Sequence, residues 1–282
     1  MKPHRPRQLR PAGPFPFKFS LRRAMFVLPN LFTISSIFCG FYAILLVSGV
    51  PGPTQMVQAT LAIFFGIFFD MADGRVARMT RTQSEFGVQL DSLADLISFG
   101  LAPAVIVHRW GLTRLGLWGV VVAFIYVACG ALRLARFNVM AARLQGGSKK
   151  FFVGLPIPLA AGVLISLVLF HQRTAATLAL RETHVQVLLL VLSYLMVSNV
   201  RYRTFKDVQV SLRSLCIFAT LALLFIGISA QIQPSFAILA FFSGYVSLGL
   251  LEEVIFFGRR RREEGGPPPA LPPEDKAAAA DV

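Results

Sequence analysis

Residues 68–100 read FFDMADGRVARMTRTQSEFGVQLDSLADLISFG and carry four aspartates at the facing ends of two apolar runs. Asp70 and Asp73 are three residues apart. Asp91 and Asp95 are four apart. With about 3.6 residues per helical turn, each pair lies on one face of its helix, and a short connection brings both faces to one end of a bundle. Carboxylates at or inside a membrane are costly, so this pattern indicates a functional site.

The rest of the chain has the composition of a membrane protein. Of its 282 residues, 55% are hydrophobic and 15% are charged, whereas a soluble domain carries about 25% charge. A helix of about 20 apolar residues spans the hydrocarbon core. Segments of this kind are predicted at 27–49, 54–72, 88–107, 115–136, 155–171, 184–200, 211–229 and 234–257. The predicted fold class is all-α, a polytopic membrane helix bundle with about eight transmembrane helices.

The basic residues predict the orientation. The formal net charge is +14. Membrane proteins concentrate Lys and Arg in cytoplasmic loops, so this excess needs no nucleic-acid partner, and none is expected. With both termini cytoplasmic, the outer connections hold few of the 28 Lys and Arg residues: Arg109, Arg114, Arg173 and Arg181. We expect a basic cytoplasmic tail (1–24), a transmembrane domain (25–257), and a C-terminal tail (258–282) that is basic at first and then Pro/Ala-rich and disordered.

The aspartates favour a hard metal cation. Four carboxylates this close cannot all stay ionised without one, and no His or Cys lies beside them in the sequence. Oxygen ligands alone suit Mg²⁺ or Mn²⁺. The alternative is that the acids cap helix ends or carry solvated charge at the interface. Small residues favour a site, because Gly74, Ala77 and Gly87 allow a ligand or a second helix to approach closely.

These residues form one spaced pattern. It reads Asp70-x-x-Asp73-Gly74-x-x-Ala77-Arg78, then eight residues, then Gly87-x-x-x-Asp91-x-x-x-Asp95. It matches the signature of the CDP-alcohol phosphatidyltransferase family at every fixed position, and the chain resembles that family over roughly residues 25–255. Four stretches further resemble the serine-using branch of the family: LPNLFTISSIFCGF (28–41), DSLADLISFGLAPA (91–104), GALRLARFNV (130–139) and FFVGLPIP (151–158).

The resemblance implies a reaction and a set of roles. A CDP-linked lipid donates its phosphatidyl group to an alcohol, and CMP leaves. In the serine branch the hydroxyl of L-serine attacks CDP-diacylglycerol directly and yields phosphatidylserine. By resemblance, Asp70, Asp73 and Asp91 hold divalent metal, two ions in all, and Asp95 is the general base and a further metal contact. The residues that contact the CDP-lipid would be Gly74, Ala77, Arg78, Ser84 and Gly87.

Two other groups are candidates from their positions. Asn30 and Thr33 open the first predicted helix, where they either line the nucleotide pocket or cap the helix. Arg133 and Arg136 share a face at the end of the fourth predicted helix, and Asn138 follows them. These arginines hold the lipid phosphate or the serine carboxylate, or else they only carry the positive charge of a cytoplasmic loop.

Other functions make different demands on the sequence. The metal motif leaves the acceptor open, since glycerol phosphate, inositol phosphate or choline would suit the same chemistry. A cation transporter would place acids near the bilayer midplane and repeat them, but the second half of the chain has no matching acidic pair.

The resemblance implies a homodimer. The charge pattern predicts a multi-pass protein of the plasma (inner) membrane, surrounded by membrane lipid, with its active site on the cytoplasmic side.

Overall fold

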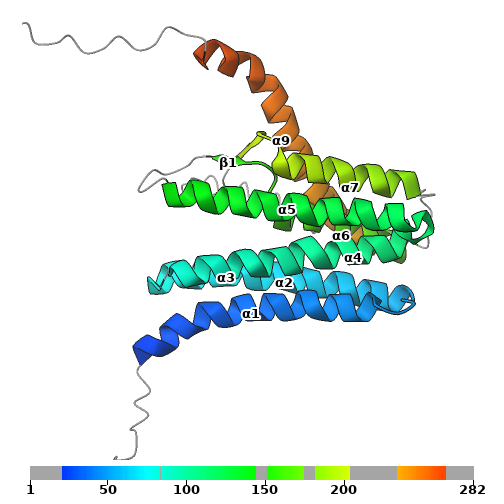
Figure 1. Cartoon of the computed structure of the whole chain (residues 1–282), viewed down its shortest axis with the longest axis horizontal. Helices are drawn as coiled ribbons and strands as arrows, with labels where there is room; N and C mark the ends of the chain where they lie inside the picture. The colour runs from blue at the N-terminus through cyan, green and yellow to red at the C-terminus, as the bar shows by residue number, and fades with distance from the viewer. Residues whose placement is uncertain (1–20, 83, 144–150, 175–181, 204–233, 265–282) are drawn as a thin grey trace, which may run out of the picture.

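The computed structural model describes residues 21–82, 84–143, 151–174, 182–203 and 234–264 (Figure 1). These residues are helical apart from short connections and two strands of three residues. The elements are α1 (Leu21–Val47), α2 (Pro53–Thr80), α3 (Glu85–Asp95), η1 (Leu96–Leu101), α4 (Ala102–Val107), η2 (His108–Leu112), η3 (Thr113–Leu115), α5 (Leu117–Arg143), β1 (Phe151–Val153), α6 (Ile157–Arg173), α7 (Glu182–Val197), β2 (Arg201–Arg203) and α9 (Pro234–Glu264).

Within the described residues, four helical segments are long and apolar enough to cross a membrane, which supports the predicted helical membrane protein. They are Val27–Val47, Pro53–Thr80, Glu85–Leu115 and Leu117–Ala141. Three other helices are apolar but shorter: Ile157–Arg173, Glu182–Val197 and Pro234–Gly249. The predicted helix over 211–229 lies outside the described residues, as does most of both predicted tails. The total of eight spans therefore stays a prediction.

Helix α2 continues beyond the predicted end at residue 72. It runs to Thr80, because the residues after the apolar run, such as Ala77 and Arg78, are good helix formers. Arg81 then adopts a left-handed conformation with φ 54°, and the Thr82 N–H bonds back to the Ala77 carbonyl at 3.0 Å. Asp70 and Asp73 consequently lie inside a helix rather than at its end.

The chain reverses direction after α2 and enters α3 at a capped start. Ser84 is the N-cap, and its Oγ accepts a hydrogen bond from the Gly87 N–H at 3.0 Å. In Figure 1 the start of α1, the start of α3 and the end of α5 lie at the same end of the bundle. Four aspartates, from the second half of α2 and from α3, are therefore presented toward this end.

The helices of the first half pack closely through small residues. A Cβ added at Gly40 of α1 would lie 2.8 Å from the Cα of Ser98 in η1, so these two backbones are in direct contact. Ser98 Oγ also donates a hydrogen bond to the Ser36 carbonyl at 2.8 Å. The buried core continues from here through α4, α5, α6 and α7. Helices α1 and η1 are thus held at a fixed separation.

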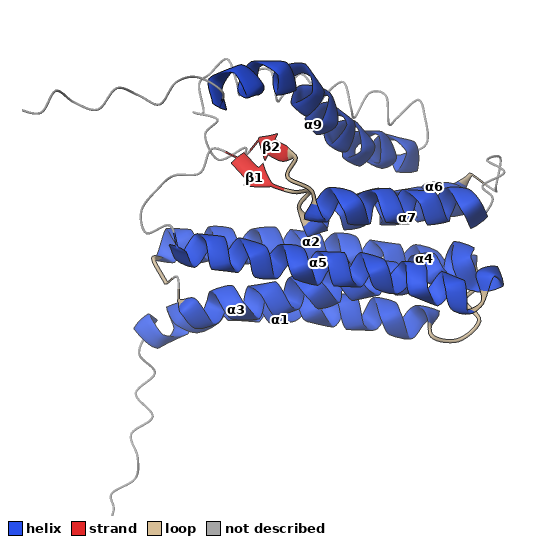
Figure 2. Ribbon diagram, turned by 45° about the horizontal axis from the view of Figure 1, so that its top comes forward, coloured by secondary structure: helices blue, strands red, loops and turns tan. Residues whose placement is uncertain are grey.

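The second half of the chain packs against this unit. Helix α6 contacts α2 and α9, and α7 contacts α5. Strand β1 pairs antiparallel with β2, with Phe151 opposite Arg203. Figure 2 shows the two strands as a small sheet beside α9. The sheet ties the segment before α6 to the segment after α7.

Candidate active site

Three carboxylates meet where α2 faces α3. One oxygen from each of Asp70, Asp91 and Asp95 lies within 4.8 Å of the others. Asp70 comes from α2, and the other two come from α3 one turn apart. Asp95 is only 9% exposed, and its Oδ1 is buried with no hydrogen-bond partner among the described residues. Of the four aspartates that the spacing singles out, the structure brings these three together.

The fourth aspartate has a different neighbour. Asp73 is buried, and its Oδ2 accepts a hydrogen bond from Thr33 Oγ1 at 2.7 Å. Thr33 Oγ1 also lies 3.1 Å from the Pro29 carbonyl of its own helix. Asp73 is not part of the three-carboxylate group, and its predicted role as a metal ligand stays a prediction. The Thr33–Asp73 bond joins α1 to α2 one turn beyond Asp70.

Asn30 and Thr33 do not cap α1. The helix begins at Leu21, so both residues lie well inside it, and the capping alternative is wrong for both. Thr33 reaches Asp73, as described above. Asn30 Oδ1 lies 3.7 Å from the position that a Cβ at Gly87 would occupy. Helix α1 therefore presents both side chains toward the helices that carry the acids.

Five of the residues predicted to contact the CDP-lipid flank the connection between α2 and α3: Gly74, Ala77 and Arg78 in the last turns of α2, and Ser84 and Gly87 at the start of α3. Arg78 folds back over Gly74, so that its Nη1 would lie 3.4 Å from a Cβ placed there. Ser84 Oγ lies 3.2 Å from the corresponding position at Gly87. Ala77 is half-buried on the same helix as Arg78. A side chain at Gly87 would crowd Ser84, whereas a Cβ at Gly74 would only reach ordinary contact with Arg78. Contact with a nucleotide stays a prediction.

Arg133 lies beside the acids. Its side chain is 7% exposed, and its Nε is buried with no hydrogen-bond partner among the described residues. Its guanidinium carbon is 5.7 Å from the centre of the Phe137 ring, a cation–π contact. Arg133 is also close enough to Asp95 for their charges to attract. A buried guanidinium with an unused donor is well suited to bind an anion.

Arg136 makes different contacts from Arg133, although both lie on one face of α5. Its guanidinium donates to the carbonyls of Val197 at 2.8 Å and Ser198 at 3.1 Å. It also reaches Met196 O and Asn199 Oδ1, each at 3.4 Å. The carbonyls of Met196 and Val197 belong to the last turn of α7, where a helix leaves its carbonyls without intrahelical partners. The arrangement favours a structural role for Arg136, as a cap on α7, over the predicted acceptor contact.

Asn138 contributes to the site through a residue that the sequence did not single out. Its Nδ2 donates to Ser92 Oγ at 2.9 Å, and Ser92 adjoins Asp91. Ser92 Oγ in turn donates to the Val88 carbonyl at 3.1 Å. The sequence DSLAD (91–95) contained the indication, because the hydroxyl of Ser92 lies between two acids of one helix face. The end of α5 is thereby tied to the acid-bearing turn of α3.

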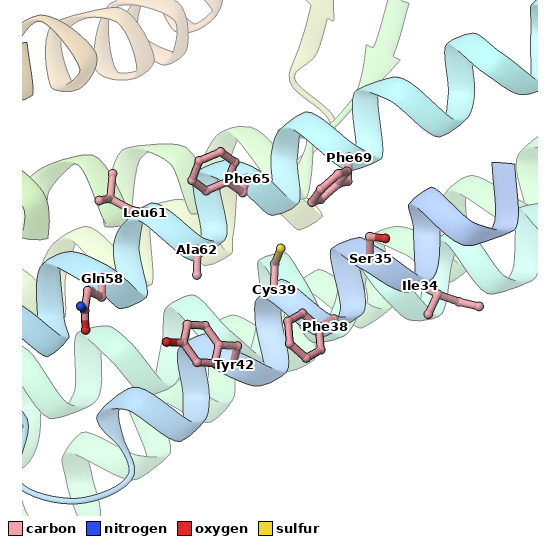
Figure 3. A pocket seen from close by; sticks show the side chains of 10 residues that line it. All are labelled: Ile34, Ser35, Phe38, Cys39, Tyr42, Gln58, Leu61, Ala62, Phe65 and Phe69. Carbon is pink, nitrogen blue, oxygen red and sulfur yellow. The ribbon is translucent and has the colours of Figure 1, made fainter. Parts of the chain in front are cut away.

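An apolar groove lies between α1 and α2 (Figure 3). Its volume is about 590 Å³. The lining residues are Ile34, Ser35, Phe38, Cys39, Tyr42, Gln58, Leu61, Ala62, Phe65 and Phe69. One end adjoins the site, since Phe69 precedes Asp70 and Ile34 follows Thr33. From Phe69 to Gln58 the groove extends about 16 Å along α2, at ~1.5 Å per residue.

The three clustered carboxylates fit a divalent cation. They supply only oxygen ligands, which hard cations prefer. Among the described residues, none of the three forms an ion pair with Lys or Arg. The unpartnered Oδ1 of Asp95 is a costly arrangement in a buried place unless a cation or a proton satisfies it. The structure thus supports a metal site formed by Asp70, Asp91 and Asp95.

Comparison with known proteins agrees with this arrangement. The family model for CDP-alcohol phosphatidyltransferase matches residues 26–200. The chain belongs to the CDP-alcohol phosphatidyltransferase family. The predicted resemblance to this family is therefore confirmed. The match covers α1 through α7, which includes every predicted site residue, and stops before α9.

The curated relatives that this chain resembles carry names closely similar to one another. A CDP-diacylglycerol–serine O-phosphatidyltransferase of Helicobacter pylori is 36% identical over 228 residues, which are 81% of this chain and 91% of the relative. The protein of that name from Bacillus subtilis is 35% identical over 185 residues, 64% of this chain and 91% of its own. An archaetidylserine synthase of Methanothermobacter thermautotrophicus is 35% identical over 179 residues, 62% of this chain and 69% of its own.

Proposed function

We propose that this chain transfers the phosphatidyl group of CDP-diacylglycerol to the hydroxyl of L-serine, giving phosphatidylserine and CMP. The observation that carries the proposal is the meeting of Asp70, Asp91 and Asp95 beside an apolar groove. Family membership supports the reaction type. The printed names of the bacterial relatives support serine as the acceptor.

A divalent cation, Mg²⁺ or Mn²⁺, would be held by Asp70, Asp91 and Asp95, with Asp73 beside them. We propose two ions in all, since four carboxylates are present. When bound there, the metal supplies positive charge that stabilises the negative charge on the phosphate oxygens during transfer. The protein contributes the fixed placement of the carboxylates, which come from two helices joined by a short capped connection.

The chemical step is a direct displacement at phosphorus. The serine hydroxyl oxygen forms a bond to the lipid-side phosphorus, and the bond from that phosphorus to the CMP oxygen breaks. Asp95 accepts the hydroxyl proton, as a general base. Positioning matters more than covalent help in this kind of transfer.

The remaining residues divide between the two substrates. We propose that the donor lies over the connection between α2 and α3, against Gly74, Ala77, Arg78, Ser84 and Gly87, with Asn30 and Thr33 facing it from α1. Arg133 holds the serine carboxylate, since its guanidinium is buried next to Asp95 and has an unused donor. Asn138 keeps α5 against α3 through Ser92. Arg136 supports the same end of α5 by capping α7.

The setting of the site follows from the charge pattern. We propose eight transmembrane helices with both termini in the cytoplasm, a domain over 25–257 between two tails, and an active site on the cytoplasmic side of the inner membrane. Basic residues near this end of the bundle, such as Arg78 and Arg133, support the orientation. Serine and CMP are water-soluble while acyl chains are not, so a site at this boundary suits all three. A homodimer is proposed from family membership.

The groove between α1 and α2 is proposed to hold an acyl chain of the donor. Its lining is apolar (Figure 3), and one end is lined by Phe69, the residue before Asp70. Cys39 lines its middle and is half-buried. We expect Cys39→Trp to raise the KM for long-chain CDP-diacylglycerol about tenfold, since each CH₂ kept out of an apolar site costs about 0.8 kcal/mol. Steady-state kinetics with donors of two chain lengths checks this.

The control for the groove is Val120→Trp, which introduces the same side chain at an exposed position on α5. It should leave both donors unaffected. A short-chain donor should tolerate Cys39→Trp, because it does not reach the middle of the groove. An equal rise in KM for short and long donors would show that the groove does not hold the acyl chain.

The function is tested with purified protein in detergent. CDP-diacylglycerol, Mg²⁺ or Mn²⁺ and labelled serine are supplied, and CMP release and lipid labelling are followed. We expect labelled phosphatidylserine that depends on the metal and is lost in Asp91→Ala. If CMP is released only with glycerol phosphate, inositol phosphate or choline, the proposed reaction type holds and serine is not the acceptor. Cation flux into liposomes without any phosphatidyl transfer would show that the protein is a transporter and not a transferase.

A further inference from the structure

A proline, which cannot donate a backbone hydrogen bond, follows the helical segment next to Asp95. In an α-helix the carbonyl of residue 99 would accept a hydrogen bond from the N–H of residue 103. Residue 103 is a proline, which has no N–H. The hydroxyl of Tyr126, on α5, donates to the Phe99 carbonyl at 3.2 Å. A side chain from another helix thus supplies a donor to a carbonyl that residue 103 cannot serve.

The helix is wide between Asp95 and this proline. Segment η1 (Leu96–Leu101) is a π-helix, and the Ala102 N–H bonds to the Ile97 carbonyl five residues back. A π turn holds more residues than an α turn, so it changes which face the preceding residues present relative to the following ones. Asp95 is the residue immediately before this turn. The direction of its side chain therefore depends on the wide turn being kept.

Both sides of the wide turn are anchored. On one side, Ser98 donates to the Ser36 carbonyl, and Gly40 allows α1 to contact the Ser98 backbone. On the other side, Tyr126 holds the Phe99 carbonyl. Phe99 and Tyr126 are both fully buried. Water cannot replace the hydroxyl there, so losing it leaves a buried carbonyl without a partner.

We propose that Tyr126 is a positioning residue for the metal-binding acids: its bond to the Phe99 carbonyl, required by Pro103, holds the wide turn that directs Asp95 toward Asp70 and Asp91. The proposal rests on the proposed function for its effect on turnover. Its structural part stands on the hydrogen bond, the π turn and the proline. A tyrosine that only filled the core would need some partner for its hydroxyl, but its loss would not depend on residue 103.

That difference gives the experiment. Tyr126→Phe, Pro103→Ala and the double variant are prepared with the full chain in detergent. Mn²⁺ binding is measured by electron paramagnetic resonance, together with kcat, KM and thermal unfolding. Tyr126→Phe is expected to weaken Mn²⁺ binding and lower kcat, each about tenfold, with the KM for serine unchanged. The matched control is Tyr194→Phe, which removes an exposed hydroxyl on α7 and should change nothing.

The double variant decides the mechanism. Pro103→Ala restores an N–H that can bond the Phe99 carbonyl, so Tyr126→Phe should cost far less in Mn²⁺ binding in the Pro103→Ala background than in the wild-type background. An equal loss in the two backgrounds would overturn the proposal, as would unchanged Mn²⁺ binding in Tyr126→Phe. If the wild-type chain makes no phosphatidylserine, the proposed function fails while the Mn²⁺ binding cycle still tests the positioning. A wild-type chain that binds no Mn²⁺ would refute the positioning proposal itself.

Discussion

Asp95→Asn is expected to lower kcat for phosphatidylserine formation by about 10³-fold, since loss of a general base removes about 10²–10⁴ in rate. The amide has nearly the same shape, but it cannot accept the hydroxyl proton. Asp95 is buried beside Asp70 and Asp91, and these two neighbours are the proposed metal ligands, so neither is free to accept the proton in its place. Rapid-quench measurement of CMP release in a single turnover checks the chemical step directly.

The matched control for Asp95→Asn is Glu85→Gln in the same helix. Glu85 is an exposed acid in the first turn of α3, outside the carboxylate group. The Glu85→Gln variant should leave kcat unchanged, which separates the effect of losing one negative charge from the effect of losing the base. Binding of CDP-diacylglycerol should persist in both variants, because the donor contacts lie on the α2–α3 connection. Near-normal turnover in Asp95→Asn would remove this residue from the chemical step.

The acid site can be predicted in outline because it is local. Spacings of three and four residues are read directly as helix faces, and the connection between α2 and α3 is short. The extension of α2 to Thr80 is not predicted, because hydropathy marks where apolar residues end, not where the helix ends. Spacing alone groups Asp73 with the other acids, because its partner, Thr33, comes from forty residues away. Periodicity within one helix carries no information on such a contact.

The two arginines show the same limit more clearly. Arg133 and Arg136 are indistinguishable by charge, by helix face and by distance from the loop. The acceptors of Arg136 follow it by about sixty residues, at the end of α7. Gly154 is an indirect indication of the contact between Arg136 and the end of α7. It has φ +80°, and a Cβ there would have no room beside Met196 O and Arg136. A glycine required by a tertiary junction cannot be told from a loop glycine in the sequence.

The structure separates these two arginines by experiment. We expect Arg133→Ala to lower kcat/KM for serine by about 10²-fold, because truncating one member of a buried charged contact costs about 2–5 kcal/mol. The KM for CDP-diacylglycerol should stay the same if the guanidinium holds the serine carboxylate rather than the lipid phosphate. Initial rates with each substrate varied in turn check both statements. A rise in the donor KM alone would assign Arg133 to the lipid phosphate.

Arg136→Ala is the matched control, since it removes the same charge from the same helix face three residues further on. Here the last carbonyls of α7 lose their donors, so thermal stability should fall while the KM for serine changes little. Arg133→Lys adds a second test, because an ammonium keeps the charge but not the planar pair of donors that a carboxylate prefers. We expect Arg133→Lys to recover part of the serine KM and Arg136→Lys to recover no thermal stability. That pair of results would distinguish anion binding at Arg133 from helix capping at Arg136. Identical behaviour of the two alanine variants would mean that both arginines act only through the packing of α5 against α7.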